Sequence, residues 1–454
     1  MPLILGTNSI KDTGYNVANS LRFDSVQGTY LNFDQGTATS ARKMTYSTWF
    51  KLSKTNDYNI LLENVASPHN SQIVIQDDGN NNDLRFYDYD GSTNIDIRTS
   101  QAIRDTSAWY HIVVAMDTTQ STASNRVKIY INGSQVTSLD YATYPSQNYD
   151  TGITNGDLQI GRQGTSSYYL DGYLAETIFV DGQQLDPTSF GEFDEDTPTI
   201  WKPKQIDVSS ITFGNNGFYL NYRDSSALGN DVSGNDNDLT ANNITSLDQS
   251  IDTCTNNFAT MNPLSKGSDI TITEGNLKVS NGSSDNSILG NIGFGNGKWY
   301  WEAKCTGATT YANIGVTLAS KHGGNHSDVD SGRVVYSHNG NVYKEGLGDS
   351  ATDTGTTFTT NDIVSVAYDA QNGSVKFYKN GTLVNTTTDS DLEFSTNEFI
   401  TSVGINEGGF ELNFGSPIYS ISSGNSDANG YGNFEYAVPS GYYSLCTKNL
   451  AEFG

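Results

Sequence analysis

The sequence predicts an all-β protein made of two antiparallel sandwiches that are joined by an acidic, ordered connector. Short strands of alternating β-branched and aromatic residues, separated by Gly, Asn and Asp turns, recur along the chain. No stretch combines capping residues with the 3.6-residue apolar spacing of an amphipathic helix. One hairpin sequence, Val-Lys-x-Tyr-x-Asn-Gly-x-x-Val, occurs at residues 127–136 and again at residues 375–384. We therefore expect two domains built on one plan.

The repeated hairpin fixes one chain reversal in each domain. Asn-Gly tolerates the positive φ angles that both central residues of a type I′ turn require, so Asn132-Gly133 and Asn380-Gly381 are predicted turns. A matching strand precedes each hairpin, at residues 112–117 and 364–369. The two copies are too far apart for a repeat array, whose period is ~20–50 residues.

Length and charge limit the classes to which the protein can belong. Its 454 residues suffice for two or three domains, and no apolar run approaches the ~18–20 residues of a membrane span. The 51 acidic and 25 basic side chains give a net charge of −26. Nucleic acid is not an expected partner, because phosphate backbones require clustered Lys and Arg. The N-terminus lacks the basic region of a signal peptide, which predicts synthesis and folding in the cytoplasm.

Residues 1–20 are predicted to form an irregular arm, and residues 21–185 the first sandwich. Its ordered motifs are Trp49-Phe50, Trp109-Tyr110-His111-Ile112-Val113, Tyr130-Ile131-Asn132-Gly133, Leu158-Gln159-Ile160-Gly161 and Leu170-Asp171-Gly172-Tyr173-Leu174-Ala175. This order resembles the laminin-G or concanavalin A-like family, although Met44-Thr45 stands where a Phe-Thr start is common. The resemblance implies a jelly-roll sandwich with loops that bind glycan or protein.

Residues 186–260 are predicted to form the acidic connector. Carboxylates there outnumber the cations Lys202, Lys204 and Arg223, and three prolines exclude a long strand. Its aromatic residues favour an ordered segment that packs on one or both sandwiches, and residues 217–222 are apolar enough to dock as a strand.

The second sandwich is predicted over residues 261–416, with a C-terminal segment, 417–454, packing near the connector. The quoted motifs are Lys298-Trp299-Tyr300-Trp301-Glu302, Tyr378-Lys379-Asn380-Gly381 and Asn413-Phe414-Gly415. Their order resembles the SPRY (B30.2-like) domain. Residues 252–260 and 439–450 resemble segments that flank SPRY domains in virion proteins of tailed phages, marine phages especially.

The three cysteines are too few for a disulfide framework. Cys305 falls within a strand and is expected to be a small buried residue. Cys254 and Cys446 share a local pattern, but we expect no disulfide between them in a cytoplasmic product.

The strongest metal candidate is a turn in the connector. Carboxylate and amide side chains cluster around Gly234, and Ca²⁺ takes 6–8 oxygen ligands. The candidate calcium ligands are Asp231, Asn235, Asp236 and Asp238. A similar turn occurs near the start of many laminin-G-like domains, where calcium binding is common. The alternative is a loop whose Asx side chains bond their own backbone.

Aromatic and histidine side chains in predicted loops are the candidate ligand contacts. Tyr168 and Tyr169 can stack on sugars or fill protein interfaces, and Tyr141, Tyr144 and Tyr149 lie in similar stretches. The histidine-bearing loop residues are His322, His326 and His338. A zinc site is not expected from them, because Gly323-Gly324 prevents a helical pair of ligands. His111, within a strand, is expected to be a packed structural residue.

An enzyme is the competing class. Some concanavalin A-like folds are glycosidases that place two carboxylates ~5–5.5 Å apart on a cleft strand. Glu192, Asp194 and Asp196 could share a face, but Gly191 and Pro198 bracket them and apolar alternation is missing. A solvated turn is the preferred interpretation.

We therefore expect a non-enzymatic virion protein of a tailed phage, a tail-fibre or host-recognition component that binds a surface glycan or receptor. A capsid or tail decoration protein is the close alternative, and a glycan hydrolase or a bacterial surface lectin the others. Expected partners are other virion subunits, with a homo-oligomer as the assembly.

Overall fold

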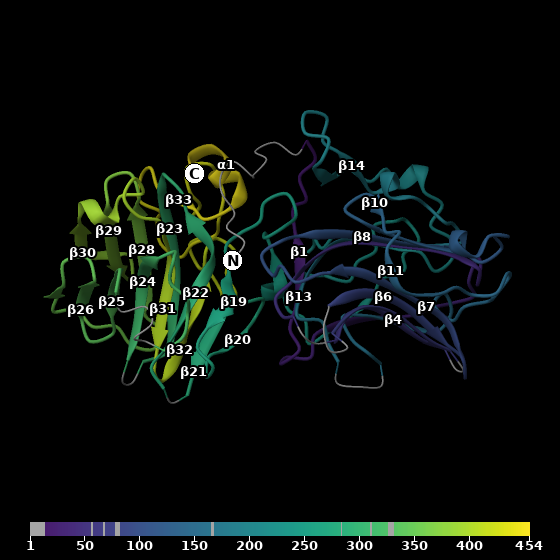
Figure 1. Cartoon of the computed structure of the whole chain (residues 1–454), viewed down its shortest axis with the longest axis horizontal. Helices are drawn as coiled ribbons and strands as arrows, with labels where there is room; N and C mark the ends of the chain where they lie inside the picture. The colour runs from purple at the N-terminus through teal and green to yellow at the C-terminus, as the bar shows by residue number, and fades with distance from the viewer. Residues whose placement is uncertain are drawn as a thin grey trace. The chain divides into compact units, whose positions relative to one another are not determined.

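The computed structural model describes residues 14–454 except 56–57, 67–68, 78–81, 165–167, 283, 309–310 and 326–330. Nearly all its regular elements are β-strands in antiparallel sheets, which confirms the all-β prediction (Figure 1). The chain divides into two compact units, the first spanning Thr13–Thr255 and the second containing Asn256–Gly454. The helical elements described are one helix and short 3-10 turns. These are α1 (Thr447–Phe453) and the turns Ala123–Asn125, Pro187–Ser189, Val208–Ser210, Ser246–Asp248 and Ser390–Leu392.

The first unit contains two eight-stranded sheets. Sheet A has the order β10-β9-β8-β3-β13-β1-β18, with β16 paired to β13. Its strands are β10 (Ser134–Gln135), β9 (Val127–Ile131), β8 (Tyr110–Asp117), β3 (Lys43–Leu52), β13 (Gly172–Asp181), β1 (Ser20–Phe23), β18 (Gln249–Ser250) and β16 (Phe218–Leu220). Sheet B has the order β11-β7-β6-β5-β4-β12-β2-β17. Its strands are β11 (Leu139–Thr143), β7 (Thr93–Ala102), β6 (Asp83–Tyr89), β5 (His69–Gln76), β4 (Tyr58–Ala66), β12 (Asp157–Ile160), β2 (Tyr30–Asp34) and β17 (Thr240–Asn242).

The second unit repeats the two-sheet plan. Sheet C has the order β19-β22-β31-β24-β25-β26-β27, and sheet D the order β20-β21-β32-β23-β28-β29-β30 with β33 added to β23. The strands of sheet C are β19 (Met261–Lys266), β22 (Asn286–Phe294), β31 (Phe399–Ile405), β24 (Ala312–Leu318), β25 (Arg333–Ser337), β26 (Asn341–Glu345) and β27 (Ser350–Asp353). Those of sheet D are β20 (Thr271–Thr273), β21 (Lys278–Asn281), β32 (Gly408–Asn413), β23 (Lys298–Ala308), β28 (Ile363–Asp369), β29 (Ser374–Lys379), β30 (Thr382–Thr388) and β33 (Tyr443–Ser444).

Each unit buries its own core between its two sheets. Successive side chains of a strand point to opposite faces, so alternate apolar residues line the interior. In the first unit Tyr46, Phe50, Phe86 and Ile112 belong to one buried cluster, and Trp299 and the other core residues of the second unit form a separate one. The seven-residue helix α1 was not predicted, because so short a segment carries less than two turns of apolar periodicity.

Both predicted Asn-Gly turns are confirmed. Asn132 and Gly133 have φ angles of 48° and 77°, and Asn380 and Gly381 have 47° and 77°. The flanking strands pair across a two-residue loop in each case, which is the geometry of a type I′ hairpin.

The predicted connector is ordered and, up to residue 255, belongs to the first unit. Residues 218–220 dock on β13 as strand β16, as the apolar pattern predicted. Strand β17 joins sheet B and β18 joins sheet A. A short hairpin in the same segment pairs β14 (Gly191–Phe193) with β15 (Trp201–Pro203). The segment covers the outer face of sheet A, where Phe190, Phe213 and Tyr219 pack against Val113 and Ile178.

The C-terminal segment covers the outer face of sheet D in the second unit. Phe434 and Tyr442 pack on Tyr300, and Phe258, at the end of the predicted connector, pairs with Cys446. The buried Glu302 of β23 holds the segment. Its carboxylate accepts hydrogen bonds from the backbone N–H groups of residues 435 and 436, both at 2.9 Å.

All three cysteines are free thiols. Cys305 is fully buried within β23, as expected from its place in a strand.

Glu302→Ala should release the C-terminal segment from sheet D. Each buried backbone N–H group that loses its acceptor costs about 1–3 kcal/mol, so we expect a loss of about 2–4 kcal/mol in the free energy of unfolding. Amide hydrogen exchange over residues 430–445 should accelerate. Glu411→Gln, on the neighbouring strand, is the matched control, and equal exchange in both variants would refute the anchoring role.

Candidate functional site

The outer face of sheet B gathers polar and aromatic side chains. Its inner face supplies apolar residues to the core, so the alternate residues of each strand point outward. Strand register aligns four of them in one row: Gln159 of β12 lies opposite Glu63 of β4, Glu63 opposite Gln72 of β5, and Gln72 opposite Tyr87 of β6. The register therefore places two amides, a carboxyl and a phenol side by side on this face.

Glu63 is the buried centre of this row. Its Oε1 accepts a hydrogen bond from Gln72 Nε2 at 3.1 Å, and its Oε2 accepts one from the backbone N–H of Gly164. Burial raises the pKa of Glu63 to about 7, and Asp157 adds to the rise, while the Gly164 and Gln72 hydrogen bonds and the Arg162 charge act against it. The carboxyl therefore anchors the chain that follows β12 rather than facing solvent.

Two tyrosine pairs include residues of the loop after β12. The Arg162 guanidinium lies 4.7 Å from the Tyr30 ring centroid and 5.8 Å from that of Tyr169. The rings of Tyr58 and Tyr168 are 4.7 Å apart, and Tyr168 is 43% exposed. Gln159 is only 5% exposed by contrast, and among the described residues its Oε1 has no hydrogen-bond partner.

A second aromatic group lies at the other end of the same face. Arg85 and Arg98 share the carboxylate of Asp96, with Nε–Oδ1 distances of 2.7 Å and 3.1 Å. The Arg85 guanidinium lies 4.1 Å from the Tyr87 ring, and that of Arg98 lies 4.3 Å from the Tyr141 ring. We call Tyr58, Tyr168, Tyr87, Tyr89 and Tyr141 the tyrosine strip.

Only some of the predicted ligand contacts fall in this site. Tyr168 and Tyr169 do, as part of the loop after β12. His322 is exposed in a loop of the second unit, and His338 follows β25, where its Nδ1 accepts the N–H of Ala312 at 3.3 Å. His326 lies outside the described residues. Among the residues that the structure describes, no three His, Cys, Asp or Glu side chains gather as a metal site.

The predicted calcium turn uses its side chains on its own backbone. Asp231 accepts N–H groups from Tyr219 and Ser233 at 2.8 Å each. Asp238 accepts the N–H of Asp231, and the Asn235 amide donates to two backbone carbonyls. Asp236 has a positive φ of 58°. These contacts are those of the Asx-turn alternative, and calcium binding stays a prediction.

The predicted carboxylate triplet spans the end of strand β14 and the turn after it. Asp194 accepts N–H groups from residues 196 and 197 and bonds Lys202 Nζ at 3.1 Å. Glu192 and Asp196 are exposed. The solvated turn predicted from Gly191 and Pro198 is thus confirmed for Asp194 and Asp196, whereas Glu192 lies on strand β14.

His111 is packed, as expected. Trp201 Nε1 donates to its Nδ1 at 3.0 Å, and its Nε2 lies 2.9 Å from Ser47 Oγ. Burial lowers the pKa of His111 to about 3. Because Nδ1 accepts from the indole, the neutral ring carries its proton on Nε2 and donates to Ser47.

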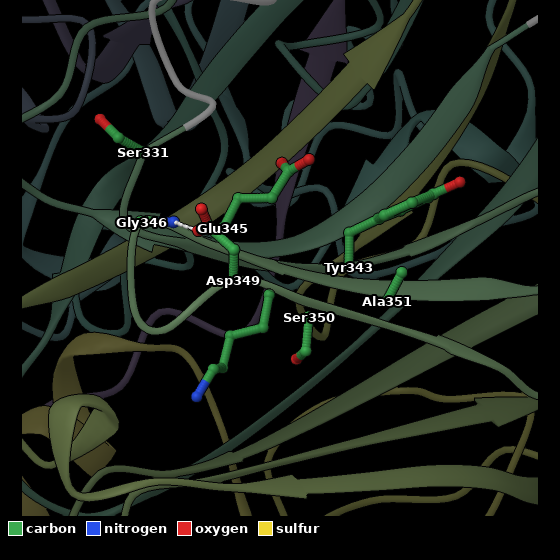
Figure 2. Close-up of a pocket in the computed structure, with 8 residues that line it drawn as sticks. Ser331, Tyr343, Glu345, Gly346, Asp349, Ser350 and Ala351 are labelled. Atoms are coloured by element: carbon green, nitrogen blue, oxygen red, sulfur yellow. Dashed lines mark hydrogen bonds between the residues drawn. The ribbon is translucent and has the colours of Figure 1, made fainter.

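The second unit has a hollow of about 560 Å³ beside β26 and β27 (Figure 2). Its polar groups are engaged within the protein. Lys344 pairs with Asp389, Glu345 pairs with Arg333, and the Asp349 carboxylate turns to the Gly346 N–H, as Figure 2 shows.

Sequence reasoning missed most of the site. The sequence motifs that indicate the first sandwich do not include strand β4, and Glu63 is therefore not among the candidate residues. Tyr141 was placed in a loop and lies on β11. The available signal was one carboxyl inside the apolar run Ile60-Leu61-Leu62-Glu63, since a buried acid needs partners.

Among the described residues no helix is long and apolar enough to cross a membrane.

Glu63→Gln should make the first unit more stable at high pH. The pKa of Glu63 is raised from 4.5 to about 7 in the folded state. Between these pH values the unfolded chain binds fewer protons, so the native protein loses stability as pH rises. Because Gln does not titrate, the free energy of unfolding of the variant should rise relative to that of the native protein by about 3 kcal/mol between pH 4.5 and pH 8. Urea unfolding of the variant and of an Asp140→Asn control at each pH measures this difference. A difference in stability that does not change with pH would contradict the raised pKa of Glu63.

Two family models match the chain. Residues 24–184 match the concanavalin A-like lectin/glucanases superfamily through its laminin G model. Residues 298–417 match the SPRY domain. No curated protein matches the chain.

Several solved structures are similar. The SPRY domain of human HERC1 is 18% identical and covers 34% of this chain and 96% of its own, with a TM-score of 0.28. A SAP-like pentraxin from Limulus polyphemus is 18% identical over 38% of this chain and 80% of its own, with a TM-score of 0.29. A proposed carbohydrate binding protein from Bacteroides ovatus is 16% identical over 51% and 60%, with a TM-score of 0.37. The two family matches support a laminin-G or concanavalin A-like domain followed by a SPRY domain, in the order that the sequence motifs indicated.

Proposed function

We propose that the protein is a non-enzymatic glycan-binding protein of a tailed-phage virion, a tail-fibre or host-recognition component. The glycan would bind on the outer face of sheet B. The matched superfamily contains lectins, which favours carbohydrate as the ligand class.

The exposed tyrosine strip is the observation that carries this proposal. Tyr141 is 53% exposed, Tyr168 43% and Tyr89 40%. Large aromatic side chains at that exposure on one face are suited to stacking on sugar rings. The tyrosine hydroxyl groups donate and accept hydrogen bonds, which suits them to the hydroxyl groups of a sugar. In ligand sites, aromatic surfaces provide affinity and a few placed polar groups fix the orientation of the ligand.

The carboxyls of the site support binding rather than hydrolysis. A glycosidase needs a carboxylic acid and a second carboxylate free to reach the scissile bond. Both oxygens of Glu63 are engaged by the protein, and the side chain is fully buried. Glu192 lies on β14, and Asp194 and Asp196 belong to the turn that follows it.

The virion assignment rests on a different observation. Residues 252–260 and 439–450 resemble the flanks of SPRY domains in tailed-phage virion proteins. In the second unit the ends of these two segments pair, since the N–H of Ala259 donates to the carbonyl of Leu445 at 3.0 Å. The second candidate is a decoration protein of the capsid or tail. Such a protein would use the faces of its sandwiches to contact neighbouring virion subunits. Assembly as a homo-oligomer with other virion subunits is part of the proposal.

Glycan binding is tested on an array of bacterial surface polysaccharides. We expect selective binding, lowered about three- to ten-fold in Tyr87→Ala because one stacking contact is lost. Tyr343→Ala in the second unit is the matched control and should leave binding unchanged. When the native protein is incubated with the polysaccharide that it binds, no reducing ends should be released. Release of reducing ends would show that the protein is a glycan hydrolase.

The location is tested by immunogold labelling of particles of the source phage with an antibody to residues 290–416. Label at tail tips is the result expected for host recognition. Label spread over the head would replace this role with decoration, and unlabelled particles would contradict a virion protein.

A further inference from the structure

The tyrosine strip runs across the strands of sheet B rather than along one of them. Tyr58 of β4 lies opposite Gln76 of β5, and the sheet continues through β6 and β7 to β11, which carries Tyr141. Four inter-strand steps of ~4.8 Å place Tyr58 and Tyr141 roughly 19 Å apart. Tyr168 stacks on Tyr58 at one end, and Tyr87 lies on β6 between the ends. Several sugar rings in a row are needed to reach both ends.

The arginines of the strip are already engaged. Arg85 donates to both oxygens of Asp96 at 2.7 Å and 2.9 Å and to Gln76 at 3.2 Å. Arg98 donates to the same carboxylate at 3.1 Å and 3.4 Å. Tyr87 and Tyr141 lie against the faces of the two guanidinium groups. An anionic sugar would have to compete with Asp96 for these donors.

Charge beyond the strip also disfavours an anion. The chain carries a net charge of −26, and long-range repulsion slows the approach of a polyanion. Hydroxyl groups both donate and accept hydrogen bonds, whereas carboxylates and sulfates only accept them. The hydroxyl groups of the exposed Tyr141, Tyr168 and Tyr89 side chains likewise donate and accept, and thus match a polyol.

We infer that the tyrosine strip binds one uncharged, linear glycan chain that crosses the strands and contacts Tyr168 and Tyr141 at the same time. This inference rests on the proposed glycan-binding function and adds the charge and the form of the ligand. Stacking on the tyrosines supplies most of the affinity, and binding is insensitive to salt because no ion pair forms with the ligand.

Matched polysaccharide pairs test the charge of the ligand. The full chain is assayed by biolayer interferometry against dextran and dextran sulfate, hydroxyethyl cellulose and carboxymethyl cellulose, and agarose and carrageenan. We expect at least one neutral member to bind at least ten-fold more tightly than its charged partner, with less than a two-fold change between 50 and 500 mM NaCl. Tighter, salt-sensitive binding of the charged members, lost in Arg98→Gln, would overturn the inference and leave the glycan-binding function standing. Failure of every member to bind would count against both.

Chain length tests whether one ligand reaches both ends. Tyr168→Ala and Tyr141→Ala should each weaken binding of the neutral polymer about three- to ten-fold, with Tyr343→Ala as the control. A disaccharide of that polymer should bind at least ten-fold more weakly than a hexasaccharide. Equal affinity of the two oligosaccharides, with two disaccharides bound per chain, would show two separate sites and overturn the inference.

Discussion

Each unit depends on an aromatic ring that packs against the glycine of an Asn-Gly hairpin. A Cβ added to Gly133 would lie 2.2 Å from the Trp201 ring, and one added to Gly381 would lie 2.6 Å from the Tyr436 ring. Asn-Gly therefore does more than provide the positive φ of a type I′ turn, because its glycine also leaves room for the covering segment. The first ring comes from residues 186–255 and the second from the C-terminal segment. The two units thus repeat both the sandwich and its cover.

Beneath each cover lies a polar group that no longer meets water. His111 is satisfied by Trp201 and Ser47, and Glu302 is satisfied by backbone N–H groups of the C-terminal segment. A buried polar group costs free energy unless it is hydrogen-bonded, so each requires its cover to stay in place. With sheet A apolar on one face and covered on the other, the outer face of sheet B is left to present side chains. Within the first unit, sheet A therefore serves as the scaffold and sheet B carries the candidate site.

The sequence predicted local geometry far better than it predicted which faces are covered. Strand alternation and Asn-Gly identified both sandwiches and both turns, because these signals act over a few residues. The covering role of Trp201 could not be read from a segment rich in acids and prolines, since it depends on a hairpin about 70 residues earlier in the chain. Glu63 and Tyr141 were missed for a related reason. Register across five or six strands brings them to one face, and register follows from turn lengths and bulges that the pattern leaves open.

Basic side chains are few in this chain, yet three arginines lie on the outer face of sheet B. Only 25 basic side chains oppose 51 acidic ones, yet Arg85, Arg98 and Arg162 share the outer face of sheet B. Each is held in place by a protein carboxyl or by tyrosine rings. An arginine fixed in this way orients its aromatic neighbours and restricts their rotamers, which lowers the entropy lost when a ligand stacks on them. The arginines of this face thus serve to preorganise the tyrosines, and recognition there depends on ring surfaces and hydroxyl partners rather than on ion pairs with the ligand.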